Sequence, residues 1–298
     1  MAKSAYKKPA ITYQQQLALL KSRGLQIPNE SKALHLLESI SYYRLSGYWY
    51  PLLEDKRAHI FKAGANFETA FQLYCFDRKL RQIVAEQLEK IEIAVRARMV
   101  YILSHAHGSL WFQNVGLFRD PDKHQQSMGY LEQELRRSDE EFMLAFNAKY
   151  SDPVPPAWIA LETASFGVLS KLYKNLKPGP ERRQVAAYFG LPDSVFDTWL
   201  HSIVYLRNIC AHHARFWNRP MRIRPQAPRR PRYTWLYNTN VAENRAYYML
   251  SMVLYLLRPI SPKTHLAGKI KALLSQYPNV DVTAMGFPPD WKEESLWQ

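Results

Sequence analysis

Apolar side chains recur every three or four residues through most of this chain, which is the spacing of one buried face of an α-helix. The longest such run begins at Phe67 and ends near His105, with no Pro or Gly inside it. Its apolar positions are Leu73, Phe76, Leu80, Val84, Leu88, Ile91, Val95, Met99 and Ile102. No stretch shows sustained alternation of period two and no internal repeat is visible, so the pattern predicts an all-α fold.

Shorter helices are expected on both sides of this run. Thr12 is the expected N-cap of the first, which Gly24 ends near Arg23, and Ser31 opens a second through about Ser41. Later helices are expected over residues 130–150, 158–175, 181–189, 241–257 and 263–276, with a further one, opened by Pro192 and Asp193, that continues towards Arg219. We expect an N-terminal helical and aromatic region over residues 1–65 and a larger helical domain over residues 66–298.

The helix after Pro192 combines an apolar stripe with an unusual density of Arg, Asn and His, in the sequence VFDTWLHSIVYLRNICAHHARFWNR. At about 100° per residue, one stripe contains Phe196, Leu200, Ile203, Cys210 and Ala214, and Arg207 falls within it. A guanidinium keeps its charge, so an inward-facing Arg207 needs a carboxylate, a phosphate or a partner chain. A neighbouring stripe is polar and contains His201, Asn208, His212 and Arg215.

The long helix has a charged edge that could meet Arg207. Arg81, Glu92 and Arg96 lie within about 60° of each other, and Glu92 and Arg96 form a favourable i,i+4 pair. If the two helices pack side by side, Glu92 is a candidate to neutralise Arg207 or to orient His212. The alternative is an exposed ladder of salt bridges, which is common on surface helices.

Composition favours an anionic partner. The 298 residues carry a formal net charge of +14 with a pI near 9.6, so nucleic acid is the first candidate and an anionic membrane surface the second. Cys75 and Cys210 both lie in helical apolar patterns, which argues against a disulfide framework and is typical of a cytoplasmic protein. The longest apolar run, from Ala246 to Leu257, is shorter than the roughly 20 residues that cross a bilayer. We expect neither a signal peptide nor a membrane span.

Two further segments could contact RNA. In SYYRLSGYWYPLL, aromatic residues surround Arg44, and Tyr42 and Tyr43 could stack on unpaired bases; the alternative is packing between two subdomains. Residues 219–232, here called the basic arm, contain no acidic residue, and their prolines prevent a helix. A phosphate backbone could lie along the arm, the alternative being a solvated loop. The arginines of the basic arm are Arg219, Arg222, Arg224, Arg229, Arg230 and Arg232.

Four strings together carry a family resemblance. RNICAHHARFWNR, PAWIALETASFGVLSKLY, SYYRLSGYWYPL and MGFPPDW resemble the Abi-like (AbiD/AbiF) abortive-infection proteins of bacteria, which are considered a branch of the HEPN superfamily. The resemblance implies a HEPN-like helical bundle with an additional N-terminal helical region. It also implies a metal-independent endoribonuclease in phage defence that uses an Arg-x4-6-His motif.

The motif residues carry over to Arg207 as the phosphate-binding cation, His212 as the general acid or base and Asn208 as the group that positions either one. Glu92, Arg96, His213 and Arg215 are the expected supporting residues. The resemblance also implies a homodimer that brings two motifs together, and products with a 2′,3′-cyclic phosphate and a 5′-hydroxyl. No cofactor is expected.

The chemistry of RNA fits these residue types. RNA supplies its own nucleophile, the 2′-hydroxyl, so cleavage needs a base, an acid and a cation beside the phosphorane. An imidazole with an unperturbed pKa of about 6.5 serves as either acid or base, and a guanidinium supplies charge and two donors.

Three other interpretations remain open. A metal at Cys210, His212 and His213 is disfavoured, because adjacent histidines point to different sides of a helix. Arg207 could be a structural ion-pair partner, with His212 a residue of the polar face. Finally, the protein could be a non-catalytic module that holds a structured non-coding RNA, or a toxin that such an RNA restrains until infection.

Overall fold

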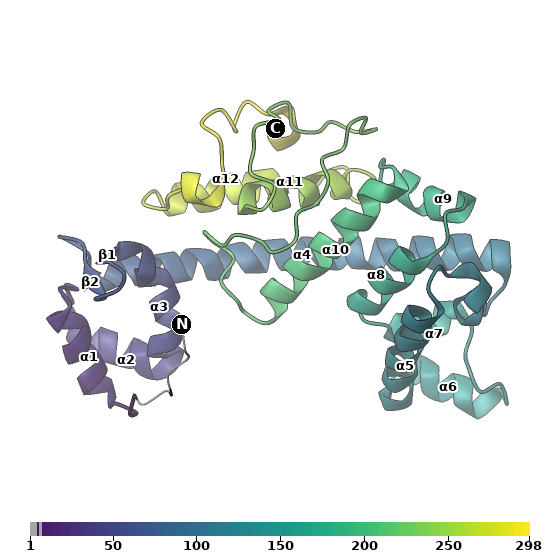
Figure 1. The fold of residues 1–298 in the computed structure, drawn as a ribbon, viewed down its shortest axis with the longest axis horizontal. Helices are drawn as coiled ribbons and strands as arrows, with labels where there is room; N and C mark the ends of the chain where they lie inside the picture. The colour runs from purple at the N-terminus through teal and green to yellow at the C-terminus, as the bar shows by residue number, and fades with distance from the viewer. Residues whose placement is uncertain (1–4, 6–7) are drawn as a thin grey trace. The chain divides into compact units, whose positions relative to one another are not determined.

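The computed structural model describes residue 5 and residues 8–298, and their chain divides into two compact units. Unit 1 contains the chain up to Leu80 together with Leu273–Val280, and unit 2 contains Arg81–Ala272 and Asp281–Gln298. The described residues form twelve α-helices and a single two-stranded sheet, which confirms the all-α class (Figure 1). The two compact units divide between Leu80 and Arg81, inside a helix. The domain boundary expected between residues 65 and 66 stays a prediction.

Unit 1 begins with three helices, α1 (Tyr13–Ser22), α2 (Glu30–Ile40) and α3 (Tyr42–Trp49). Thr12 caps α1 as predicted, because its hydroxyl accepts from the N–H of Gln15 while the Gln15 side chain accepts from the N–H of Thr12. The cap of α2 is Asn29 rather than the predicted Ser31. A short antiparallel hairpin that the sequence did not predict follows, formed by β1 (Leu53–Asp55) and β2 (Ile60–Phe61).

The long helix is confirmed as α4 (Phe67–His107). Eight of the nine predicted apolar positions are buried, from Leu73 to Met99. Ile102 is only half-buried, and Leu103 takes the next buried position. The first residues of α4 belong to unit 1 and the part from Arg81 belongs to unit 2.

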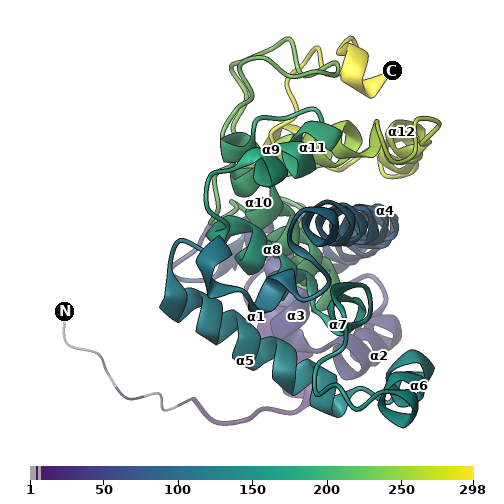
Figure 2. The ribbon, with the colours of Figure 1, turned by 90° about the vertical axis from the view of Figure 1, so that its right-hand side faces the viewer.

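Unit 2 continues through α5 (Pro121–Arg137), α6 (Glu141–Lys149), α7 (Ala157–Thr163), α8 (Phe166–Asn175), α9 (Pro180–Tyr188), α10 (Asp193–Ala211), α11 (Ala246–Leu257) and the start of α12 (Leu266–Gln276). Short 3-10 turns lie at Trp111–Gln113, Val115–Leu117, Thr283–Met285 and Ser295–Trp297. Successive helices α5, α8, α10 and α11 pack one on the next (Figure 2).

Three of the predicted helices break or end at other residues, and the helix expected over 241–257 begins only at Ala246. The helix expected over 130–150 is two helices, because α5 starts at Pro121, capped by Asp120, and ends at Arg137. The helix expected over 158–175 breaks at Ala164, and Ser165 caps α8. The helix expected to continue towards Arg219 ends at Ala211, and His213 has a left-handed φ of 54°.

The core of unit 2 centres on α11, whose twelve residues are all buried. The C-terminal tail packs onto it, since the ring of Trp297 stacks on Tyr247 and its indole N–H donates to the hydroxyl of Ser251 at 3.0 Å. Within the described chain, no helix has both the length and the apolar character that crossing a bilayer requires.

Candidate functional site

Helix α10 presents Arg207 at the edge of its buried face. Pro192 precedes the helix and Asp193 lies in its first turn, where a carboxylate is favourable. Phe196, Leu200, Ile203 and Cys210 of the predicted stripe are buried, but the Arg207 side chain is 41% exposed. The sequence therefore predicted four positions of the stripe correctly, but it placed Arg207 too far inside and included Ala214, which lies beyond the end of the helix.

A carboxylate of α4 lies against this arginine. Oε2 of Glu92 is 3.4 Å from Nε of Arg207, and Oε1 of Glu92 is 3.3 Å from a terminal nitrogen of Arg96. Glu92 and Arg96 are only 13% and 11% exposed. The carboxylate of Glu92 thus contacts two guanidiniums, and of these two Arg207 is the one that reaches solvent.

Arg96 is fixed from a second direction. It donates to the backbone carbonyl of Ala164 at 2.9 Å, and it lies 3.8 Å from the carboxylate of Glu162. Ala164 occupies the break between α7 and α8. This arrangement orients Glu92 from behind, so Arg207 is held by a preorganised partner and keeps part of its guanidinium open to solvent.

His212 lies at the C-terminus of α10, where it is the capping residue. Its backbone N–H donates to the carbonyl of Asn208 at 3.0 Å, and both side chains are exposed. The predicted polar stripe is wrong beyond this point, because the helix has ended before His213 and Arg215. His212 is therefore accessible to a large ligand on the same end of the helix as Arg207.

The chain after the helix is anchored by aromatic residues. Phe216 and Trp217 are buried, and the guanidinium of Arg219 lies over the ring of Tyr205 at 5.9 Å from its centroid. Arg215 and Arg219 are half-buried, whereas His213 is exposed. In the described part of the chain, no group of three His, Cys, Asp or Glu side chains is placed to hold a metal ion, and Cys75 and Cys210 do not form a disulfide.

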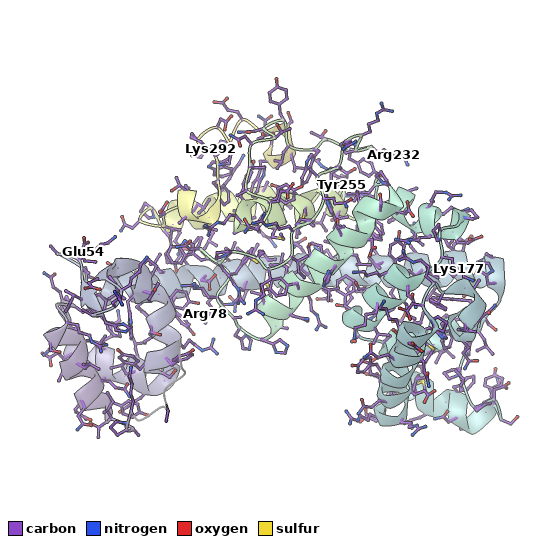
Figure 3. All side chains as sticks on the ribbon, viewed as in Figure 1. Glu54, Arg78, Lys177, Arg232, Tyr255 and Lys292 are labelled. Carbon is purple, nitrogen blue, oxygen red and sulfur yellow. The ribbon has the colours of Figure 1, made fainter. Side chains whose placement is uncertain are left out.

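The basic arm is irregular, as predicted, and its backbone is fixed to unit 2. The indole N–H of Trp199 donates to the carbonyl of Gln226 at 2.8 Å, and the N–H of Arg232 donates to the carbonyl of Gly190 at 3.1 Å. Tyr255 lies inside the unit beneath the arm and Arg232 lies at its surface (Figure 3). The exposed arginines of the arm are Arg222, Arg224, Arg229, Arg230 and Arg232.

The predicted aromatic platform belongs to unit 1 and has two kinds of residue. Tyr48 and Trp49 are buried, and the Tyr48 hydroxyl donates to Asp77 at 2.7 Å, so these two serve packing. Tyr42 is half-buried with its ring against Trp49 and its hydroxyl accepting from Arg23. Tyr43 is 89% exposed and Arg44 is exposed, which leaves Tyr43 as the ring available for stacking.

Sequence reasoning missed a second charged group on α10. Arg182 of α9 is buried and lies 3.5 Å from Asp193 and 3.3 Å from Asp197. Burial raises the pKa of Asp197, which Arg182 partly opposes, and burial also lowers the pKa of His201. The i,i+4 spacing of Asp193, Asp197 and His201 is visible in the sequence, but their basic partner on α9 is not.

The comparisons with known proteins give one match. Residues 35–218, more than half of the chain, match the model of a family described as Abi-like protein. The matched region contains α10 with Arg207 and His212, the Glu92–Arg96 pair of α4 and the start of the chain after the helix. No curated protein and no solved structure matches the chain.

Proposed function

This chain belongs to the Abi-like protein family, associated with abortive infection and so with phage defence, and from that premise we propose that it is a metal-independent endoribonuclease. The observation that carries the proposal is the pairing of Arg207 with buried Glu92, five positions before an exposed His212. The guanidinium of Arg207 is oriented by Glu92 and remains partly exposed to solvent, which suits it to bind a phosphate. The exposed imidazole of His212, at the C-cap of the same helix, suits proton transfer.

The proposed reaction is transesterification within the RNA strand. The 2′-oxygen attacks the adjacent phosphorus, the bond from phosphorus to the 5′-oxygen breaks, and the products are a 2′,3′-cyclic phosphate and a 5′-hydroxyl. Arg207 donates to the non-bridging oxygens, whose negative charge grows in the phosphorane. His212 either accepts the proton of the 2′-hydroxyl or supplies one to the departing 5′-oxygen.

The two proton transfers need two groups, and each chain offers one exposed imidazole at such a motif, that of His212, because the histidine of the other Arg-x4-His spacing, Arg119–His124, is buried. We therefore propose that a homodimer supplies one His212 from each copy. Asn208 positions the imidazole or the phosphate, and the basic arm holds the flanking backbone. As part of this proposal, the helical bundle is a HEPN-like fold.

The test is cleavage of a mixed RNA pool by the purified full chain in the presence of EDTA, followed by analysis of the end groups. We expect cleavage that survives chelation and leaves cyclic phosphates. Arg207→Ala and His212→Ala should each reduce cleavage at least a hundredfold, which is the usual effect of losing an electrostatic or acid-base group. Undiminished cleavage by both variants would rule the proposal out.

His35→Ala is the control for His212→Ala, because His35 is also an exposed histidine but lies on α2 in unit 1. It should cleave at the rate of the unchanged chain. Unfolding curves for all three variants separate a lost group from a lost fold.

A second candidate function is storage of a structured non-coding RNA without cleavage. The Arg207–Glu92 ion pair favours it, because that contact also serves a purely structural role at the packing of α4 and α10. RNA that co-purifies with a chain that cleaves nothing would support this candidate. RNA that co-purifies and suppresses cleavage until it is removed would support a toxin restrained by its RNA.

A further inference from the structure

Unit 2 contains a cavity of about 470 Å³ that lies beyond the proposed cleavage motif. Its walls come from the end of the basic arm, the segment after it, helix α11 and the C-terminal tail. The residues used below are Arg229, Trp235, Tyr237, Glu243, Tyr248 and Glu294. The volume falls within the range of small-molecule sites, about 300–1,000 Å³.

Three aromatic residues, Trp235, Tyr237 and Tyr248, line the cavity. Trp235 is half-buried and meets Tyr248 edge to face at 5.4 Å between ring centroids. Tyr237 is 95% exposed, an unusual position for so large a ring in a folded segment. A planar ligand inserted here would cover apolar ring surface that now faces water.

The hydroxyl of Tyr248 has no hydrogen-bond partner in the described chain, although the residue is only 2% exposed. A buried donor without a partner is costly, and a ligand acceptor in the cavity would remove that cost. Burial and the neighbouring charge of Glu243 both raise the pKa of this tyrosine, so its hydroxyl keeps its proton at neutral pH.

The two carboxylates of the wall have different roles. Glu294 is buried and accepts from the backbone N–H groups of Tyr237 and Asn238, each at 2.8 Å, which fixes the rim. Glu243 is half-buried and, within the described residues, no hydrogen bond or ion pair engages it. It is the acceptor that remains for a ligand.

We propose that this cavity binds a guanine base. Guanine presents two adjacent N–H donors, N1 and the 2-amino group, to a carboxylate such as Glu243, and its O6 accepts from a hydroxyl such as that of Tyr248. Adenine, cytosine and uracil each lack one of the two adjacent donors. Trp235 and Tyr237 stack on the base, and Arg229 at the rim pairs with a phosphate.

The base could come from a free nucleotide or from an unpaired position in RNA. With RNA as the source, the inference rests on the proposed function; with a free nucleotide it does not. Neither source requires cleavage at Arg207 and His212, so the His212→Ala variant of the full chain should bind as the unchanged chain does. This variant therefore separates the two proposals.

The first experiment is calorimetric titration of the full chain with guanosine, inosine, adenosine, cytidine and uridine monophosphates. We expect guanosine monophosphate to bind at least tenfold more tightly than the other four. Inosine monophosphate is the sharpest comparison, because it differs from the guanine ligand only by the 2-amino group. A parallel titration uses a short oligouridine strand with and without one central guanosine.

Tyr248→Phe removes only the unpartnered hydroxyl and should weaken guanine binding about tenfold, as loss of one good hydrogen bond does. Tyr247→Phe is its matched control, since it deletes the same atom from the neighbouring residue of α11, which does not line the cavity. Glu243→Gln should abolish the preference over inosine. Tyr237→Ala, at an exposed position that the fold tolerates, should weaken all bases alike.

Guanine-selective binding of the mononucleotide, lost in Tyr248→Phe and kept in Tyr247→Phe, would support a nucleotide site. Selectivity seen only with the oligonucleotide would support an unpaired base of RNA as the occupant. Equal binding of all probes, or binding of none in either titration, would overturn the proposal.

Discussion

At the scale of single residues, Glu92 is the centre of the candidate site because one carboxylate serves two arginines. Arg207 alone would be an ordinary exposed cation with many rotamers. Paired with a carboxylate that is 13% exposed, it has a fixed direction before any ligand arrives. Preorganisation of this kind is what makes a cation useful to a phosphorane, since no reorganisation is needed during the reaction.

Glu92→Gln tests this role by keeping the shape of the side chain and removing its charge. We expect a loss of about 2 kcal/mol in the free energy of unfolding, because Arg96 stays buried while Arg207 can turn to water. The rate of RNA cleavage should fall by more than the smaller fraction of folded protein explains, because Arg207 loses its orientation. Urea unfolding and RNA cleavage assays measure the two effects.

Glu89→Gln is the matched control, since Glu89 lies one turn earlier on α4 and is exposed. It should leave both quantities unchanged. If Glu92→Gln also left both unchanged, Glu92 would be neither a structural nor a positioning group.

Asp281 gives a pH dependence with a definite sign. Its carboxylate accepts from the hydroxyl and N–H of Thr283 and from the N–H of Ala284, and the Thr283 hydroxyl is the main cause that lowers the pKa of Asp281 below 3.8. Because the pKa of Asp281 is lower in the folded than in the unfolded state, its ionised form stabilises the fold at any pH above the unfolded-state pKa. This stabilisation is lost as the pH falls through the folded-state pKa. Asp281→Asn should therefore lower stability at pH 7 and reduce the further loss between pH 5 and pH 3, measured by urea unfolding.

At the scale of elements, periodicity located α4, α9, α11 and the buried stripe of α10 because each depends mainly on the spacing of its own apolar residues. Breaks inside helices were harder to predict. Residues 158–175 contain good helix formers on both sides of Ala164, and only a serine marks the break. The hairpin of β1 and β2 is too short to show an alternating pattern.

For the candidate site, too, the sequence predicted the positions of residues within helices but not the places where helices end. The edge position of Glu92 and the stripe position of Arg207 follow from helical geometry, so their proximity could be inferred from two helices alone. The contribution of Ala164 could not, because a backbone carbonyl is available to Arg96 only where a helix has ended. The end of α10 at Ala211 was missed because His212 and His213 carry no Gly or Pro signal.

Ser165→Ala tests the importance of that break. The Ser165 hydroxyl caps α8 by accepting from the N–H of Val168, and loss of such a cap costs about 1 kcal/mol. Because the break also presents the Ala164 carbonyl to Arg96, we expect cleavage to fall along with stability. Ser39→Ala, at an exposed position of α2 without a capping role, should change neither. A stable and fully active Ser165→Ala chain would show that the break does not support the site.

At the scale of the whole molecule, the net charge of +14 and the local placement of arginines make different contributions to RNA binding. The net charge attracts any polyanion from a distance, whichever residues carry it. Direct phosphate contacts, in contrast, release counterions, and for single strands each contact adds about 0.7 to the slope of log affinity against log salt. The slope therefore reports contacts, while total charge mainly sets the association rate.

The double variant Arg222→Gln, Arg224→Gln applies this distinction to the basic arm, where both side chains are exposed. If both contact phosphates, the magnitude of the slope should fall by roughly 1.4. Arg136→Gln, Arg137→Gln removes the same charge from exposed positions at the end of α5 and should leave the slope unchanged. Filter binding of a labelled single strand at several salt concentrations gives both slopes. Equal reductions in the two variants would mean that the arm attracts RNA only through net charge, and the arm would then have no direct role in holding the strand.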